Sequence, residues 1–302
     1  MAINRVEIKD FLVFNGEFSA DFCPGANVLI GGNGTGKTTL LKGLYAARMY
    51  PNSRVENNDD KNNMRYYDFV EINTETFGMA VYIPEKDILE HAKGLLTFIE
   101  QKQTGFSQVY KDVLIIAQDV PTQEQTEAQR IVGEKINSII GGKVEWVSNE
   151  GTYYTVRTDG LRIPFANEAS GYKKLGFLGL LVSNGQLRPG SVLFWDEPEN
   201  SLNPELVPKV VNILLELAKN GVQIFIATHD YNLARYFDVR KNKDIPVTFH
   251  NLSKSDNGQI ICDSSPEYLK LSSNLLESAN EDLFKTVVNA GFEVWEGDDE
   301  QH

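Results

Sequence analysis

Residues 31–39 read Gly31-Gly32-Asn33-Gly34-Thr35-Gly36-Lys37-Thr38-Thr39, and they stand between two segments of different periodicity. The apolar run Asn27–Ile30 before them is typical of a buried strand, and residues 38–49 after them carry apolar side chains at helical spacing. A strand, a glycine-rich loop and a helix in this order predict backbone N–H groups that point inward and form a nest for an anion. The positive end of the helix dipole lies at the same point, so the loop is predicted to bind phosphate groups.

The same stretch fits the P-loop pattern G-x-x-x-x-G-K-[ST] at every position from Gly31 to Thr38. All nine residues of the stretch are therefore predicted to bind a nucleotide. Lys37 is expected to bridge the β and γ phosphates and to act in catalysis, and the Thr38 hydroxyl is expected to ligate Mg²⁺. A simple glycine turn is the alternative, and the flanking strand and helix argue against it.

A second segment, Val192–Trp195, is a short apolar run that ends in Asp196-Glu197. The run predicts a buried parallel strand whose end delivers Asp196 to the coordination sphere of Mg²⁺. Glu197 beside it is predicted to polarise the attacking water as a general base. An acidic pair that caps a helix is the alternative, and the intact P-loop favours the catalytic interpretation.

A third segment, Val222–Ala227, is another apolar run, and it ends at Thr228-His229. The carboxyl ends of parallel strands converge on a ligand in sheets of this kind. His229 is therefore predicted to act in catalysis by reaching the γ-phosphate and orienting the water. A single histidine after a strand is more often structural, and that alternative stays open at this point.

With these motifs the chain resembles the ATP-binding-cassette (ABC) ATPases, and it is more similar to their SMC-, RecF- and OLD-like branch than to their transporter branch. That family has a signature element before the acidic strand, whose serine and glycine bind the ATP held by a second subunit. The matching stretch here is Asn167–Leu175, in which Ser170 and Gly171 match and Tyr172-Lys173 departs from the pattern. The resemblance implies a homodimer around two ATP molecules, whereas the pair Ser170-Gly171 by itself is also the pattern of a helix N-cap.

Three further family positions match less well. The family's loop after the acidic strand corresponds to Glu199–Pro204, which implies a place at the subunit interface. The glutamine that the family uses near Mg²⁺ is replaced by Glu85, which is predicted either to ligate the metal or to point away. The family's arginine near the nucleotide is replaced by Leu12, so the adenine contacts stay open, with Arg5 and Phe14 as candidates.

The order of the elements predicts an α/β fold, and the resemblance implies a P-loop NTPase of ABC-ATPase type with a mixed β-sheet core and a helical subdomain insert. The ATPase domain is expected over residues 1–265, with the variable insert at about 86–165, and a C-terminal helix and acidic tail follow at 266–302. Predicted helices are 38–49, 86–103, 106–117, 122–140, 171–184, 204–220 and 273–290. Predicted strands and hairpins are 5–9, 17–22, 27–30, 66–72, 76–83, 144–157, 192–195, 222–227 and 247–262, and a surface loop is expected at 51–64.

The composition limits the class of protein. Hydrophobic residues make up 41% and charged residues 24%, which excludes wholesale disorder and a fibrous chain. Asp and Glu outnumber Lys and Arg by 42 to 29, and the net charge of −13 argues against a protein that coats DNA or an anionic membrane. Cys23 and Cys262, far apart in sequence, predict neither a disulfide framework nor a zinc site. The apolar runs are too short to span a membrane, so a cytoplasmic protein is expected.

These features predict an enzyme, an ATP hydrolase that uses ATP and Mg²⁺ and works as a nucleotide-switched dimer. It is predicted to control a protein partner, an effector such as a nuclease or toxin, in antiviral defence, DNA repair or another nucleic-acid-linked process. A nucleic-acid ligand is left open, and the net charge gives it no support. The nucleotide-binding subunit of a transporter and a non-hydrolysing ATP-sensing scaffold are the alternatives.

Overall fold

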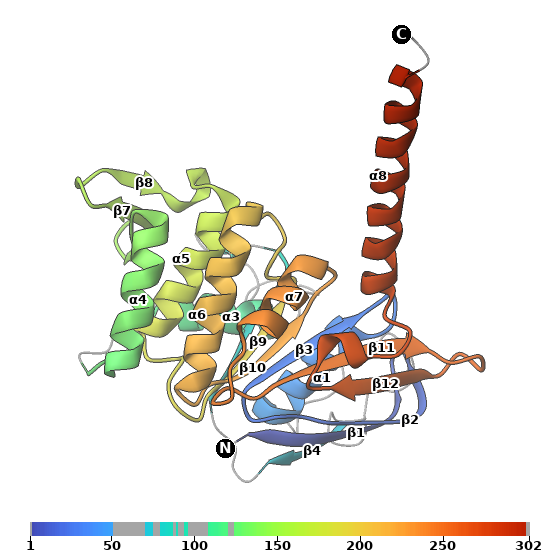
Figure 1. Ribbon diagram of the computed structural model, residues 1–302. Helices are drawn as coiled ribbons and strands as arrows, with labels where there is room; N and C mark the ends of the chain where they lie inside the picture. The colour runs from blue at the N-terminus through green and yellow to red at the C-terminus, as the bar shows by residue number, and fades with distance from the viewer. Residues whose placement is uncertain are drawn as a thin grey trace.

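The computed structural model describes residues 2–50, 70–74, 79–86, 89, 94–95, 108–119 and 124–299, with the backbone only for residues 74 and 291–299 (Figure 1). The predicted loop at 51–64 and nearly all of the predicted helix at 86–103 lie outside the described residues.

A six-stranded sheet forms the centre of the described fold, with the strand order β12-β11-β3-β10-β9-β5. Its strands are β3 (Ala26–Gly31), β5 (Ala80–Ile83), β9 (Val192–Asp196), β10 (Gln223–Ala227), β11 (Val247–Lys254) and β12 (Ile260–Ser265). Neighbouring strands are parallel except for β12, which pairs antiparallel with β11, so the sheet is mixed as predicted. The four strands β3, β5, β9 and β10 are buried along their whole length, which explains their continuous apolar runs.

Helix α1 lies between this sheet and a smaller antiparallel one. The smaller sheet has the order β2-β1-β4, and the elements are β1 (Ile3–Phe11), β2 (Phe14–Asp21), β4 (Val70–Thr74) and α1 (Lys37–Met49). On one side α1 contacts β4, and on the other it contacts β5, β9 and β10. Its leucines Leu40, Leu41 and Leu44 are fully buried in this layer, so the helix that follows the glycine-rich loop is held from both sides.

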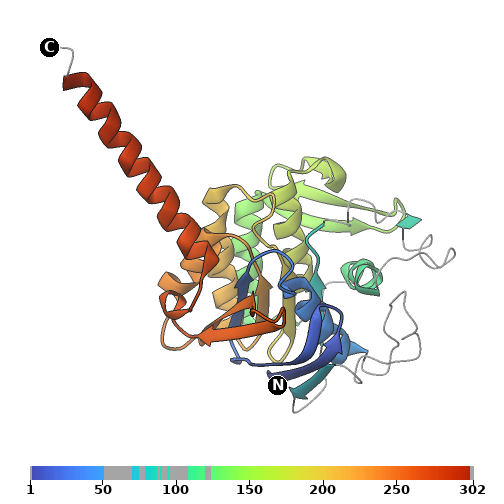
Figure 2. The same ribbon diagram turned by 90° about the vertical axis from the view of Figure 1, so that its right-hand side faces the viewer.

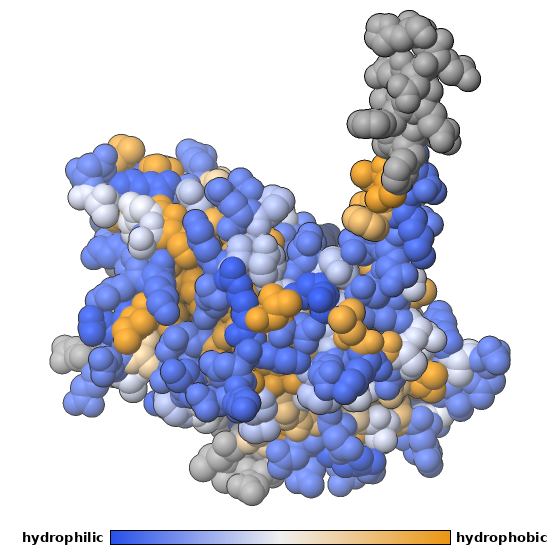
Figure 3. All heavy atoms as spheres, viewed as in Figure 1, coloured by the Kyte–Doolittle hydropathy of each residue, from blue (hydrophilic) through white to orange (hydrophobic). Residues whose placement is uncertain are grey.

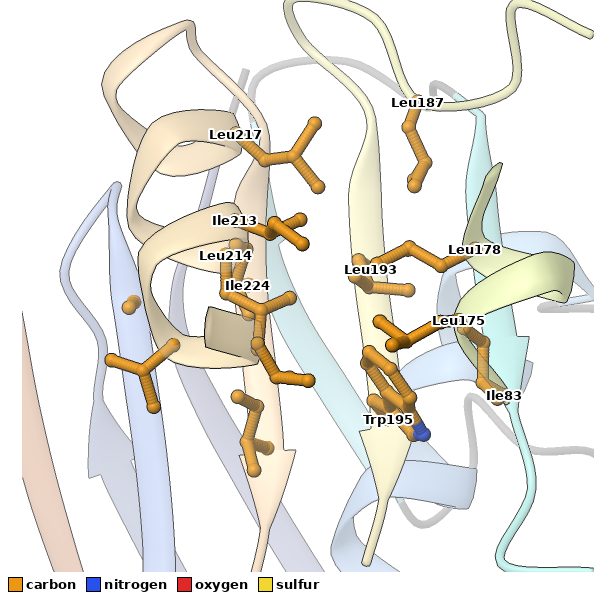
Figure 4. Close-up of a cluster of buried hydrophobic side chains, with 14 of the residues drawn as sticks. Ile83, Leu175, Leu178, Leu187, Leu193, Trp195, Ile213, Leu214, Leu217 and Ile224 are labelled. Atoms are coloured by element: carbon orange, nitrogen blue, oxygen red, sulfur yellow. The ribbon is translucent and has the colours of Figure 1, made fainter. Parts of the chain in front are cut away.

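Helices α5 (Ser170–Ser183) and α6 (Val207–Lys219) pack on the opposite face of the central sheet. Figure 4 shows Leu193 and Trp195 of β9 and Ile224 of β10 among the leucines and isoleucines of these two helices. The intervening residues Phe194 and Phe225 belong to the core on the α1 side, which is the alternation expected of strands buried on both faces.

The remaining helices and a third sheet surround this core. Helix α4 (Glu127–Ile140) contacts α5 and α6, and α3 (Gln108–Ala117) contacts α5 and β5. Helix α7 (Tyr231–Arg240) contacts α6, and the third sheet has the order β6-β7-β8, with β6 (Gly142–Val147), β7 (Thr152–Arg157) and β8 (Arg162–Pro164). Short 3₁₀ helices occupy Phe165–Asn167, Pro204–Leu206 and Tyr268–Lys270.

The last helix, α8 (Leu275–Asp299), stands away from the rest of the molecule in both ribbon views (Figures 1 and 2). Its contacts with the body are made near its first residues, against α7 and β3. A helix was predicted over 273–290, and the helix observed extends nine residues further.

The predicted α/β class and the mixed sheet are confirmed, and the differences are local. The helix predicted from residue 122 begins only at Glu127, because Thr126 and Gln129 form a capping box that fixes its first turn. The strand β8, whose three residues pair with β7, and the helix α7, which begins after Asp230, were not predicted. The Asp230 carboxylate accepts a hydrogen bond from the Leu233 N–H, and this N-cap was the available signal for α7.

Candidate functional site

The glycine-rich loop connects the end of β3 to the start of α1, and two of its glycines are required by their surroundings. Gly31 has φ = 136°, and a Cβ there would lie 2.1 Å from the Leu252 carbonyl oxygen on the neighbouring strand β11. Gly36 has φ = 89°, and a Cβ there would lie 2.9 Å from side-chain atoms of both Val13 and Phe14. Positive φ and close approach together allow only glycine at these two positions without strain.

Lys37, the first residue of α1, folds back over the loop. Its Nζ donates hydrogen bonds to the carbonyl oxygens of Gly31 at 2.8 Å and Gly32 at 2.9 Å. Burial lowers the pKa of Lys37 to about 8, and the carboxylates of Glu197 and Asp196 oppose this shift. At neutral pH the ammonium is therefore still largely charged, as a ligand for phosphate oxygens must be.

Thr38 and Asp196 bring two oxygen groups together from distant parts of the chain. The Thr38 hydroxyl donates to Asp196 Oδ1 at 3.1 Å, and the buried Tyr82 hydroxyl of β5 donates to Asp196 Oδ2 at 3.1 Å. Burial raises the pKa of Asp196, while the two hydrogen bonds lower it. A hydroxyl and a carboxylate side by side are the hard oxygen ligands that Mg²⁺ prefers, so this pair fits the predicted metal.

Glu197 follows β9 in a strained backbone conformation. Its φ is 48°, in the left-handed region that side-chain-bearing residues rarely adopt. Its N–H donates to the Ala227 carbonyl oxygen of β10 at 2.9 Å, and its own carbonyl oxygen accepts from Lys174 Nζ at 2.8 Å. Burial and, after it, the negative charge of Glu85 raise the pKa of Glu197. The carboxylate is thus more basic than usual, as suits a general base.

His229 lies beside this carboxylate. Its Nε2 is 3.6 Å from Glu197 Oε1, and the two side chains keep exposed fractions of 35% and 28%. Burial and, after it, the charge of Lys37 lower the pKa of His229, so the imidazole is neutral at physiological pH. The structure therefore brings Lys37, Asp196, Glu197 and His229 to one edge of the sheet, where β3, β9 and β10 end.

Glu199 is a residue of this cluster that the sequence patterns did not single out for a role of its own. Its Oε1 accepts hydrogen bonds from the Thr228 hydroxyl at 2.7 Å and from the His229 N–H at 3.1 Å. It thereby ties the loop after β9 to the end of β10, where His229 sits. A third acidic residue so soon after Asp196-Glu197 was the only sequence signal.

Glu85 lies at the same end of the sheet, and its partner is a residue of the loop after β9. Its exposed carboxylate accepts a hydrogen bond from Asn200 Nδ2 at 3.2 Å. After burial, the negative charge of Glu85 is the next cause that raises the pKa of Glu197. This contact joins β5 to the loop, and the predicted metal-binding role of Glu85 stays a prediction.

Ser170 and Gly171 are the first two residues of α5, but Ser170 is not its N-cap. The N-cap of α5 is Ala169, so Ser170 is the first helical residue and the interpretation of Ser170 as an N-cap is wrong. Ser170 is exposed, and a Cβ at Gly171 would lie 3.2 Å from the Leu202 side chain. Neither residue is among the contacts that join Lys37, Asp196, Glu197 and His229 within one chain.

The two candidates for adenine contact are engaged elsewhere. Phe14 is buried beneath Gly36, and Arg5 forms ion pairs with Glu7 and Asp21 on the small sheet. The exposed residue nearest to Gly36 is instead Val13, in the turn between β1 and β2.

Comparisons with known proteins match the chain to two family models. Residues 5–152 match the family model described as "AAA domain", and residues 111–235 match the one described as "AAA domain, putative AbiEii toxin, Type IV TA system". The chain is 22% identical over 253 residues to the energy-coupling factor transporter ATP-binding protein EcfA2 of Clostridium perfringens, covering 83% of this chain and 72% of that protein.

Two further likenesses differ in extent. The EcfA protein of Methanothermobacter thermautotrophicus is 26% identical over 128 residues, which is 40% of this chain and 36% of that protein. The chain thus spans about a third of the length of this relative. Among solved structures, an SMC head domain bound to the C-terminal winged-helix domain of ScpA aligns with a TM-score of 0.55 at 13% identity, covering 88% of this chain and 98% of that one. This likeness shows the fold.

Among the described residues, no helix combines the length and apolar character needed to cross a membrane.

Proposed function

We propose that the chain is a P-loop ATPase of the ABC/AAA type, which binds and hydrolyses ATP with Mg²⁺ as a switch that pairs two copies of itself. The observation that carries the proposal is the meeting of Lys37, Thr38, Asp196, Glu197 and His229 at one edge of the sheet. No group of three or more His, Cys, Asp or Glu side chains suited to a metal occurs in the described part of the chain. Thr38 and Asp196 would therefore hold Mg²⁺ together with phosphate oxygens and water, as metals of this class are usually held.

Each residue has a separate task in the proposed reaction. Bound Mg²⁺ would supply positive charge to the β and γ phosphates, and Lys37 would add its own after leaving the loop carbonyls. Glu197 takes a proton from the attacking water, whose oxygen forms a bond to the γ phosphorus while the bridging P–O bond to ADP breaks. His229 orients the water and the γ-phosphate from the neighbouring strand, and ADP and phosphate are the products.

The second part of the proposal is that Ser170 and Gly171 serve the ATP of another copy. Both lie at the amino end of α5, where backbone N–H groups and the helix dipole favour an anion. Within one chain they stand outside the cluster around Lys37, as they would if they acted on the second copy. ATP would then hold two chains together, and hydrolysis would release them.

Light scattering tests this switch. Glu197→Gln removes the base and keeps the shape, so the variant is expected to double its mass in saturating ATP with Mg²⁺ and to be monomeric without it. Lys37→Ala is the control, because a chain that cannot hold the phosphates should stay monomeric in both conditions. A Glu197→Gln protein that stays monomeric in ATP would refute the switch, while phosphate release by the natural chain would still establish hydrolysis.

For the biological role we propose control of a protein effector, such as a nuclease or toxin, in the cytoplasm. The family model that covers residues 111–235 is described with a toxin of a type IV toxin–antitoxin system, which supports a defence role. The net charge of −13 favours a basic protein partner over nucleic acid. Plating of phage on cells that carry the natural gene region, compared with its Lys37→Ala version, tests the role, and equal plaque counts would contradict it.

The nucleotide-binding subunit of a transporter is the second candidate, favoured by the likeness to the transporter ATP-binding protein EcfA2. A transporter subunit should sediment with membranes when its gene neighbours are co-expressed, whereas a defence switch should stay in the supernatant. A non-hydrolysing scaffold is distinguished from both by the phosphate-release assay, in which it would show no turnover dependent on Glu197.

A further inference from the structure

Helix α8 exposes an apolar stripe that no other part of the described chain covers. The exposed fractions are 61% for Leu283, 68% for Phe284, 61% for Val287 and 36% for Val288. At 100° per residue these four side chains fall on one side of the helix, together with Leu276 and the polar residues Glu277 and Asn280, and Ser278, Asp282 and Asn289 fall on the other. Figure 3 shows the apolar side chains together on the projecting helix. Such a patch marks a protein-binding surface.

The base of α8 lies on the phosphate-binding loop. Leu275 Cδ1 is 3.3 Å from the position that a Cβ would take at Gly32, and α8 contacts β3, the strand that enters the loop. The chain turns sharply at Ser273, whose φ is 51°, just before α8 begins. Beside this turn, Asn251 Nδ2 of β11 donates a hydrogen bond to the Ser272 carbonyl oxygen at 2.8 Å. The stripe is therefore carried on a helix that is anchored at the nucleotide site.

Two copies of α8 are poor partners for each other. The helix contains seven acidic residues and one lysine, Lys285, which already pairs with Glu281. Side-by-side packing of two such helices would bring like charges together, which is unfavourable along a helix pair. The partner of the stripe must be another surface.

A second copy of the chain offers such a surface between α4 and α5. The groove there has a volume of about 390 Å³. Its apolar lining comes from residues such as Ile136, Ile140, Gly176, Gly179 and Leu180, and polar side chains, among them Arg130, Glu134, Lys143 and Glu145, make up the other half of the lining. Nothing lies within 4 Å of the position of a Cβ at Gly133, so a helix can come close at this point. Helix α5 is also the helix that begins with Ser170, the residue proposed to meet the loop of the other copy.

The spacing along the two helices agrees with this arrangement. Phe284 and Val287 lie nine and twelve residues beyond Leu275, and Gly179 and Val182 lie nine and twelve residues beyond Ser170. At 1.5 Å per residue both pairs lie roughly 14 and 18 Å from the loop at which the two helices would meet. In a pair in which α8 runs parallel to α5 of the second copy, the stripe and the groove would lie at the same distance from that loop.

We infer that the stripe of α8 docks in the α4–α5 groove of the second copy when ATP pairs the two chains. The inference rests on the proposed function, because it needs the paired state. In a symmetric pair each chain gives one α8 and receives one, so the contact occurs twice and the two acidic helices stay apart.

Dimerisation of the Glu197→Gln protein in ATP provides the first test. Adding Phe284→Asp and Val287→Asp is expected to weaken the dimer at least about tenfold in sedimentation equilibrium. Adding Ser278→Asp and Asn289→Asp, with the same added charge on the opposite face, should change the affinity less than about twofold. Equal affinity of the stripe variant and its parent would overturn the inference. A parent that stays monomeric in ATP would instead overturn the proposed function.

Disulfide formation provides the second test and locates the contact. In the Glu197→Gln protein with Cys23 and Cys262 changed to serine, Gly133→Cys and Val287→Cys chains are mixed with ATP. The expected product is a cross-linked pair that forms with ATP and not without it, while Asn289→Cys in place of Val287→Cys gives none. A dimer that forms in ATP with no cross-link above the Asn289→Cys control would overturn the docking in this groove.

Discussion

Glu197, the proposed general base, has a left-handed backbone conformation that is unfavourable for a residue with a side chain. A residue with a side chain at φ = 48° carries a strain of about 1 kcal/mol or more, which glycine does not. The neighbouring hydrogen bonds from its N–H to β10 and from Lys174 to its carbonyl oxygen keep it in that conformation. In this conformation Glu197 Oε1 lies 3.6 Å from His229 Nε2.

Glu197→Gly should therefore stabilise the fold while it removes hydrolysis. We expect a gain of about 1 kcal/mol in the free energy of unfolding and a loss of phosphate release of about 10²-fold or more. Urea unfolding and a phosphate assay measure the two effects. Glu205→Gly, at an exposed position of the 3₁₀ helix Pro204–Leu206, is the control and should not stabilise the fold. A Glu197→Gly protein less stable than the natural chain would contradict the strain argument.

Tyr82 positions Asp196, and its loss should appear in the Mg²⁺ requirement. Tyr82→Phe keeps the ring and removes the hydrogen bond to Asp196 Oδ2, worth about 1 kcal/mol net. The Mg²⁺ concentration needed for half-maximal ATP binding should rise about fivefold. Tyr154→Phe, which removes an exposed hydroxyl that donates to Glu150, should leave it unchanged. An unchanged requirement in Tyr82→Phe would contradict the role.

Glu85 should influence the pH dependence of hydrolysis. Its charge raises the pKa of Glu197, and Glu197 must be deprotonated to act as the base. Glu85→Gln lowers that pKa, so the acidic limb of the pH–rate profile is expected to move to lower pH, and Glu145→Gln should leave it in place. A Glu85→Gln profile unmoved at constant Mg²⁺ would contradict this. A higher Mg²⁺ requirement in the same variant would support the predicted metal-binding role.

At the scale of elements, the parts predictable from sequence are those that local pattern specifies. The loop at 31–39, the strand that ends at Asp196 and the strand that ends before Thr228 are all short continuous segments, and each formed as predicted. The roles of Tyr82 and Glu199 were not predictable, because each depends on a partner more than 25 residues away in sequence. Likewise β8 exists through its pairing with β7, since three residues carry no periodic signal.

The pairing of β11 with β3 contains a buried histidine that should make stability depend on pH. His250 is fully buried, and Asn27 Oδ1 can only accept, so His250 Nε2 carries the proton and Nδ1 accepts from the Ser264 hydroxyl. Burial lowers the pKa of His250 to about 4, from an ordinary 6.5. Between these values the unfolded chain binds a proton that the folded chain does not.

The free energy of unfolding should accordingly fall as the pH drops from 6.5 toward 4. The contribution of His250 is fully present at neutral pH, and its loss amounts to about 3 kcal/mol once the pH is below 4. Urea unfolding at pH 7.5, 6 and 5 measures the slope. His250→Gln is expected to be less stable at pH 7.5 and to show a shallower slope. An equal slope in the two proteins would show that His250 is not the group responsible.

At the scale of the whole molecule, the charge of −13 bears on nucleic acid. A binder of DNA neutralises phosphates with Lys and Arg, and its affinity falls steeply with salt. We expect no shifted band for a 30-base-pair duplex in a mobility-shift assay at 200 mM salt, with or without ATP. A shifted band whose logarithmic affinity falls linearly with the logarithm of the salt concentration would contradict this and point to a local basic groove.

The hydrogen bonds of the Lys37 ammonium affect which ligands can bind at the glycine-rich loop. Two of the three N–H donors of its ammonium bind the carbonyl oxygens of Gly31 and Gly32, so a ligand that is to engage all three must replace these two acceptors. A diphosphate or triphosphate chain offers more phosphate oxygens for this purpose than a monophosphate does. We therefore expect nucleoside monophosphates to bind at this loop more weakly than ADP and ATP. The protein would then respond to the ratio of ATP to ADP with little interference from AMP.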